Sequence, residues 1–327
     1  MSAAQPIRDR LSMLQPRRAR VAAFLLSVLG ATTQDRYLRA LQAFLLWTRA
    51  EQIDFDTLPF EEQDIVLADY GLHLRTETGM IQDYRDTMAS VQKQFPGRTF
   101  KTAWKVVSAW AKQKPAQQVP PLSQELASAL SVLLAAAGRP GIDIVIALAF
   151  AGMLRISEAL RLRWGDLLFS ERGLVLRLLQ TKLGETQYVV VDNVHTQKFV
   201  LGLRPPGASG ADFLCPTGYS TFRFWFQSGL RVCGCAHLGF KSHSLRRGGA
   251  TCRLMHGYTM ARIMTEGRWN SEASCRLYLR AAEATILQIR RDLSPEKQAL
   301  VRTLASLWGQ VVMQTCSDES RMAGTER

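Results

Sequence analysis

The chain has 327 residues, 47% of them hydrophobic, which is enough for two domains that each bury a core. Its 41 Lys and Arg residues exceed its 28 Asp and Glu residues and give a net charge of +13, which favours a polyanionic partner, nucleic acid first. No stretch of about 20 apolar residues occurs, and the arginine-containing start lacks a signal-type apolar core. We therefore expect an intracellular protein with no membrane partner.

The cysteines show neither paired Cys-x-x-Cys knuckles nor the pattern of a small disulfide-rich domain. Cys233, Cys235 and His237 stand close together, but no second, separated ligand pair is available to complete a tetrahedral site. The sequence therefore predicts reduced thiols and no metal site.

Apolar residues recur at helical spacing in the first third of the chain, over 34–47, 64–74, 80–95 and 100–112. In the last of these segments Trp104, Val107 and Ala111 form an apolar stripe, whereas Lys101 and Lys105 project from a separate face. This pattern predicts a helical domain over 1–111 with a basic face that contacts DNA. A charged face that only meets solvent is the alternative.

Residues 112–121 contain three prolines and no periodicity, which predicts an extended linker. A second domain is expected over 122–293. It should begin with a helix capped by Ser123, and a second helix should run over 142–151.

Two β-rich runs interrupt the helical pattern, at 174–176 and 188–191, and they predict a hairpin with Lys182 near its tip. Helical spacing then returns at 220–232, 246–256, 259–266 and 271–282. The remaining segment, 294–327, is expected to be an amphipathic helix and tail carrying Trp308.

Two arginine-containing motifs lie in the predicted second domain. The segment 152–160, GMLRISEAL, resembles the first arginine box of the tyrosine recombinase (phage integrase) family, and the segment 243–246, HSLR, is similar to its His-x-x-Arg box. Trp269 and Tyr278 follow in the order and at the intervals that this family shows. The glycine-containing sequence after Arg246, together with Trp269, is similar to recombinases of eukaryotic mobile elements.

The resemblance implies a mainly α protein with a small β-hairpin or sheet in the catalytic domain, in a two-domain tyrosine-recombinase-like architecture. It also implies a site-specific recombinase that integrates or excises DNA. Tyr278 would attack a phosphodiester and form a 3′-phosphotyrosine, with no cofactor. Its partners would be double-stranded DNA and three further copies, as a homotetramer on two DNA sites. The terminal helix would then dock on a neighbouring copy, although its apolar face fits packing on its own domain equally well.

Each residue type in the motifs suits a task in phosphoryl transfer. Arg155 and Arg246 offer forked donors to phosphate oxygens, a geometry that lysine cannot reproduce. The resemblance assigns Lys182 as the general acid, and His243 as a phosphate contact or proton carrier.

Trp269 can donate one hydrogen bond but cannot carry protons, so we expect it to position and pack. Glu158 would orient a basic neighbour from behind the site, and Arg247 is expected to contact DNA or to form a surface ion pair.

Two other functions are compatible with this sequence. A type IB topoisomerase uses similar tyrosine chemistry without exchanging partners, and a catalytically silent DNA-binding protein of the same fold needs only the basic charge. The location would be DNA-associated in each case, in the nucleus of a eukaryote or the cytoplasm of a bacterium.

Overall fold

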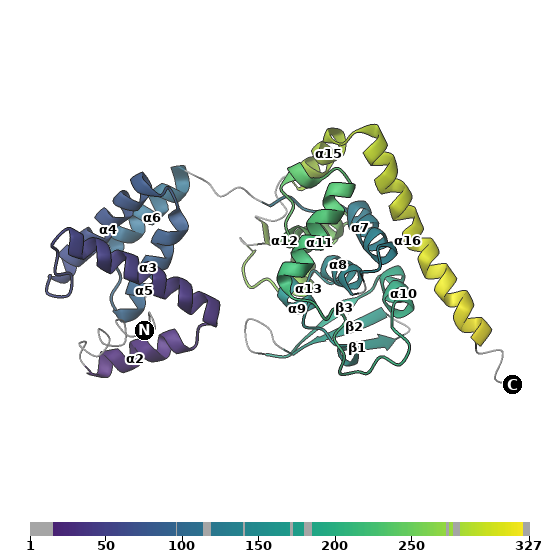
Figure 1. The fold of residues 1–327 in the computed structure, drawn as a ribbon, viewed down its shortest axis with the longest axis horizontal. Coiled ribbons are helices and arrows are strands. Elements are labelled where there is room, and N and C mark those ends of the chain that lie inside the picture. The colour runs from purple at the N-terminus through teal and green to yellow at the C-terminus, as the bar shows by residue number, and fades with distance from the viewer. Residues whose placement is uncertain are drawn as a thin grey trace. The chain divides into compact units, whose positions relative to one another are not determined.

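The computed structural model describes residues 16–95, 97–113, 119–139, 141–170, 173–179, 185–272, 275–276 and 282–322. The chain forms two compact units, residues 1–117 and 118–327 (Figure 1). Their division falls inside the proline-containing segment 112–121.

The first unit is helical in its described part. Its helices are α2 (Pro16–Ser27), α3 (Ala31–Ala50), α4 (Phe60–Glu77), α5 (Ile81–Gln94) and α6 (Lys101–Gln113). Large aromatic side chains such as Phe44, Tyr84 and Trp110 fill its core. Asp64 of α4 caps α6, because its carboxylate accepts hydrogen bonds from the N–H groups of Thr102 and Ala103 at 2.8 and 2.9 Å.

Helix α6 is rotated slightly from the expected orientation. Its buried stripe is Ala103, Val107 and Trp110, whereas Trp104 is only half-buried. The spacing of these three residues still follows one helix face, and the large indole of Trp110 is buried at 2% exposure. Lys101 and Lys105 are both exposed.

The second unit is also mainly α, with one small sheet. Its helices are α7 (Gln124–Ala136), α8 (Ile142–Ala151), α9 (Ile156–Ala159), η1 (Trp164–Asp166), α10 (Val194–Gly202), α11 (Tyr219–Val232), η2 (Ala236–Leu238), α12 (His243–Met255), α13 (Met260–Gly267), α15 (Ala282–Asp292) and α16 (Pro295–Met322). Ser123 caps α7 as predicted, accepting a hydrogen bond from the N–H of Leu126. No helix in the described part of the chain combines the length and apolarity needed to cross a bilayer.

The sheet is antiparallel, in the order β1 (Leu167–Ser170), β2 (Gly173–Leu178) and β3 (Gln187–Val191). The predicted hairpin corresponds to β2 and β3, and β1 adds a strand that the sequence did not predict. The mainly α fold with a small sheet is thus confirmed.

Helix α12 approaches its neighbours unusually closely because it carries two glycines. A Cβ on Gly248 would lie 2.2 Å from the carbonyl oxygen of Leu122, and a Cβ on Gly249 would lie 2.1 Å from that of Phe150. Only glycine permits this distance between α12 and α8. The close contact places the start of α12 beside the loop that follows α8.

Helix α16 packs on α7 and α10 of its own chain (Figure 1). The ring of Trp308 stacks on Phe199 with 4.0 Å between ring centroids. Up to Trp308, the apolar face of the terminal helix therefore packs within its own domain, one of the two arrangements that its sequence allowed.

Candidate active site

Arg246 joins two segments that lie far apart in the sequence. It occupies the first turn of α12 and is 2% exposed. Its Nη1 donates to the carbonyl oxygen of Met153, and its Nη2 donates to that of Gly267. These contacts fix the plane of the guanidinium and hold the segment before Arg155 next to the turn that carries Trp269.

Arg155 and Arg268 share one carboxylate. Arg155 precedes α9, and its Nη1 lies 2.7 Å from Oε1 of Glu158, whereas Nη2 of Arg268 lies 2.9 Å from Oε2. The backbone N–H of Arg155 also donates to Oε2 at 2.8 Å. Burial alone would raise the pKa of Glu158, but Arg268 and the contacts from Arg155 outweigh burial and lower it. Glu158 is therefore a stable anion that holds two guanidinium groups together.

His243 stands at the start of α12, among arginines. Burial lowers the pKa of its imidazole to about 4, and the charges of Arg246, Arg247 and Arg155 act in the same direction. The imidazole is thus neutral at pH 7. The three charged groups that shift its pKa are all cations, so positive charge dominates around it and an anion would be attracted to this place.

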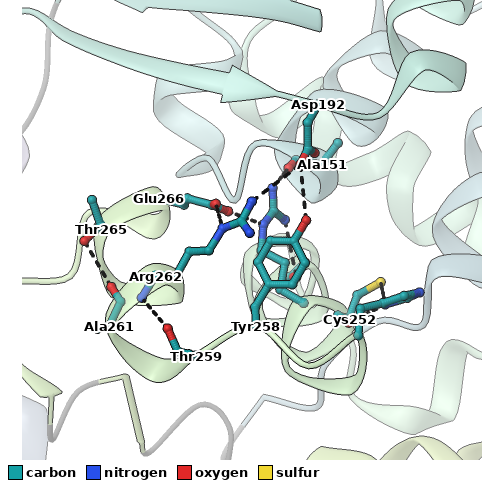
Figure 2. Close-up of polar contacts among 12 residues, drawn as sticks. Ala151, Asp192, Cys252, Tyr258, Thr259, Ala261, Arg262, Thr265 and Glu266 are labelled. Atoms are coloured by element: carbon teal, nitrogen blue, oxygen red, sulfur yellow. Dashed lines mark hydrogen bonds and ion pairs between the residues drawn. The ribbon is translucent and has the colours of Figure 1, made fainter. Parts of the chain in front are cut away.

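The turn between α12 and α13 is braced by ion pairs (Figure 2). Glu266 accepts from Nε of Arg253 and from Nε of Arg262, both at 2.7 Å. Arg253 also donates to the carbonyl oxygen of Ala151, and Tyr258 donates to Asp192 at 3.2 Å. This network fixes α13, and therefore the turn that follows it, against the end of α8.

Trp269 packs against the guanidinium of Arg246. Its ring centroid lies 4.3 Å from Cζ of Arg246, a cation–π contact. The indole also packs against a small apolar cluster that contains Met153, Ala250 and Ile263. The position fits the predicted role in packing and orientation.

No protein-family model matches the sequence, and no curated protein is significantly similar to it. Solved structures do share its fold. The XerH site-specific recombinase, in a post-cleavage complex with palindromic difH substrate, has a TM-score of 0.60 at 14% identity over 80% of this chain and 80% of that protein. A lambda integrase (75–356) dimer bound to a COC′ core site has a TM-score of 0.53 at 15% identity, over 80% of this chain and 93% of that one.

A third match is the Tn1549 transposon integrase (82–397) in complex with circular intermediate DNA. Its TM-score is 0.53 at 16% identity, over 82% of this chain and 98% of the integrase chain. This chain has the tyrosine-recombinase fold. At such identities the likeness concerns the fold alone.

On this tyrosine-recombinase fold, four of the six predicted catalytic residues are described. Arg155, His243, Arg246 and Trp269 lie close together, through the contacts given above. Lys182 and Tyr278 lie outside the described residues.

Two further assignments are clarified by burial and contacts. Arg247, predicted as a DNA contact or a surface ion pair, is 6% exposed and close to His243, so a surface ion pair is excluded and the DNA contact stays a prediction. Tyr258, the nearest tyrosine before Tyr278 in the sequence, donates its hydroxyl to Asp192, and Cζ of Arg262 lies 3.9 Å from its ring centroid.

Arg268 is the residue of this site that the sequence did not predict. No general motif contains it, and an arginine beside a tryptophan is an ordinary pair in a basic chain. A buried Glu158 needs cationic partners, but the sequence alone does not tell which of the many arginines supplies the second one.

Proposed function

We propose that this protein is a site-specific DNA recombinase that cuts and rejoins DNA through a 3′-phosphotyrosine. The observation that carries the proposal is the gathering of Arg155, Arg246 and Arg247 around a neutral His243, within a tyrosine-recombinase fold. Preorganised guanidinium groups in a largely buried place are suited to the charge that develops on a phosphate during transfer.

In the proposed reaction the phenolic oxygen of Tyr278 attacks the phosphorus, and the bond between phosphorus and the 5′ oxygen breaks. Lys182 gives a proton to the departing 5′ oxygen. Arg155 and Arg246 hold the nonbridging oxygens, and the neutral imidazole of His243 hydrogen-bonds the phosphate or accepts the proton of the phenol. The phosphotyrosine ester keeps the energy of the phosphodiester, so religation to another strand needs no cofactor.

Covalent capture tests the proposed nucleophile. Duplexes selected from random DNA for binding would be nicked near the cleavage position, so that the released end diffuses away and the adduct accumulates. The wild type should give a denaturation-resistant adduct, and Tyr278→Phe should give none. Tyr258→Phe is the matched control, because it removes a hydroxyl that donates to Asp192, and it should still form the adduct. An undiminished adduct with Tyr278→Phe would reject the assignment.

Partner exchange separates the recombinase from a type IB topoisomerase. A recombinase joins strands from two duplexes, and we propose that it does so as a homotetramer on two sites, in the DNA-containing compartment of its cell. Joint molecules in the presence of two labelled duplexes are the expected product. Relaxation of supercoils without joint molecules would favour the topoisomerase, and binding without any adduct would favour a silent DNA-binding protein.

A further inference from the structure

Arg268 has more hydrogen-bonding capacity than its contact with Glu158 uses. Its side chain is 10% exposed, and only Nη2 reaches Glu158. Its Nε and Nη1 are buried and have no hydrogen-bond partner in the part of the chain that the structure describes. Buried donors without partners are unusual and costly in folded proteins, so these two nitrogens need a physical explanation.

The backbone at Arg268 is also unusual. The residue ends α13 with φ 58° and ψ 48°, in the left-handed region that glycine adopts without strain. A non-glycine residue with such angles suggests that its side chain is needed at that place. Its neighbours are fixed too, since a Cβ on Gly267 would lie 1.7 Å from the ring of Trp269.

A structural ion pair alone does not account for this arrangement. An arginine that serves only to balance a buried carboxylate commonly uses two parallel N–H groups, yet Arg268 contacts Glu158 through a single nitrogen. Glu158 already receives two hydrogen bonds from Arg155. The carboxylate of Glu158 instead holds together the guanidinium groups of Arg155 and Arg268, which would otherwise repel each other.

We propose that Arg268 is a further phosphate-binding residue, an inference that rests on the proposed function. Nitrogens not engaged by Glu158 donate to a nonbridging oxygen of the DNA phosphodiester that Arg155 and Arg246 hold. Glu158 then acts as the spacer that lets Arg155 and Arg268 approach one phosphate together. The phosphate in turn supplies the partner that the buried nitrogens lack.

The affinity for DNA at a fixed salt concentration measures this contact. A charge-assisted hydrogen bond from an arginine to a phosphate oxygen changes Kd on the order of 10-fold. Arg268→Gly removes the guanidinium and relieves the left-handed backbone, so the variant should fold. Its Kd for a selected duplex should rise on the order of 10-fold, and its rate of adduct formation should fall on the order of 100-fold.

Two variants separate phosphate binding from a purely structural role. Glu158→Gln disrupts the ion pair but leaves the arginine, so its affinity for the duplex should be no lower than that of the wild type. Arg268→Lys keeps the charge and should lose less affinity than Arg268→Gly, but it should form the adduct more slowly than the wild type because the planar fork is lost. Thermal melting of each variant checks that it is folded.

An unchanged Kd in a folded Arg268→Gly variant would overturn the proposal. The proposal would also be wrong if Arg268→Gly and Glu158→Gln slowed adduct formation equally without any change in Kd, because Arg268 would then only position Glu158. These outcomes differ from failure of the proposed function, in which the wild type itself forms no adduct while the affinities for DNA remain measurable.

Discussion

Replacing Gly249 by alanine should damage the site more than the fold. The added Cβ would lie 2.1 Å from the carbonyl oxygen of Phe150, where ordinary contacts are 3.4–4 Å, so α12 has to move away from α8. Overpacking of this kind costs about 1–3 kcal/mol. The better helix propensity of alanine returns about 1 kcal/mol. We therefore expect a net loss of up to about 2 kcal/mol, a decrease in Tm of roughly 4–8 °C for a unit of this size.

The effect on activity should be larger because Arg246 lies on the same helix. A movement on the order of 1 Å pulls its guanidinium away from the carbonyl oxygens of Met153 and Gly267, and misplacement by that amount can cost about 100-fold in rate. Calorimetry gives the Tm, and the nicked duplex gives the rate of adduct formation.

Gly218→Ala is the matched control for this substitution. Gly218 lies in the same unit, its φ is −77°, and nothing is within 4 Å of the position of its added Cβ. This variant should keep nearly the wild-type Tm and rate. If Gly249→Ala behaved like Gly218→Ala in both measurements, the close approach of α12 and α8 would not be what positions Arg246.

Three further predictions concern individual side chains. Arg155→Lys and Arg246→Lys should each fold, as judged by thermal melting, because the positive charge remains. Each should lose most of its adduct formation, because lysine lacks the forked donors of the guanidinium. Normal rates in both variants would argue against a phosphate clamp. Burial lowers the pKa of His243 to about 4, below its value in the unfolded chain, so the unfolded state binds the extra proton as pH falls from about 6.5 to 4. The free energy of unfolding should fall over that range by at most about 3 kcal/mol, and His243→Asn should lack this part of the pH dependence; identical pH profiles would refute the assignment. Lys182→Ala should be rescued by a bridging phosphorothiolate, whose sulfur leaves without a proton, and equal defects on both substrates would exclude the general-acid role.

Local signals explain why much of the fold could be predicted. The apolar run of α8 is buried almost throughout, and Ser123 begins α7 as a capping residue should. Strands β2 and β3 carry strong β-formers, whereas β1 is four residues long and its pairing with β2 depends on contacts outside its own sequence. A short element with a weak local signal is therefore hard to predict.

The candidate site could be predicted only where a motif spans it. The boxes around Arg155 and Arg246 identify two guanidinium groups. The carbonyl oxygens that fix Arg246 belong to the backbone, so residue types alone cannot reveal them. Burial is equally hidden, as Arg247 shows: the sequence suggests a surface residue, and the structure places its side chain inside the domain. The role proposed for Arg268 depends on a left-handed turn that only the folded chain reveals.

The turn at the end of α13 connects the arginines of the site to the rest of the domain. Gly267 accepts a hydrogen bond from Arg246, Arg268 reaches Glu158, and Trp269 covers the guanidinium of Arg246. Because Glu266, directly before them, is held by Arg253 and Arg262, the turn cannot shift without breaking ion pairs on both α12 and α13. In the proposed function, the rate depends on where the guanidinium groups are before the phosphate binds, so flexible arginine side chains need such bracing. Under that proposal, the glycines of α12 and the ion pairs of α13 both fix the positions of the arginines.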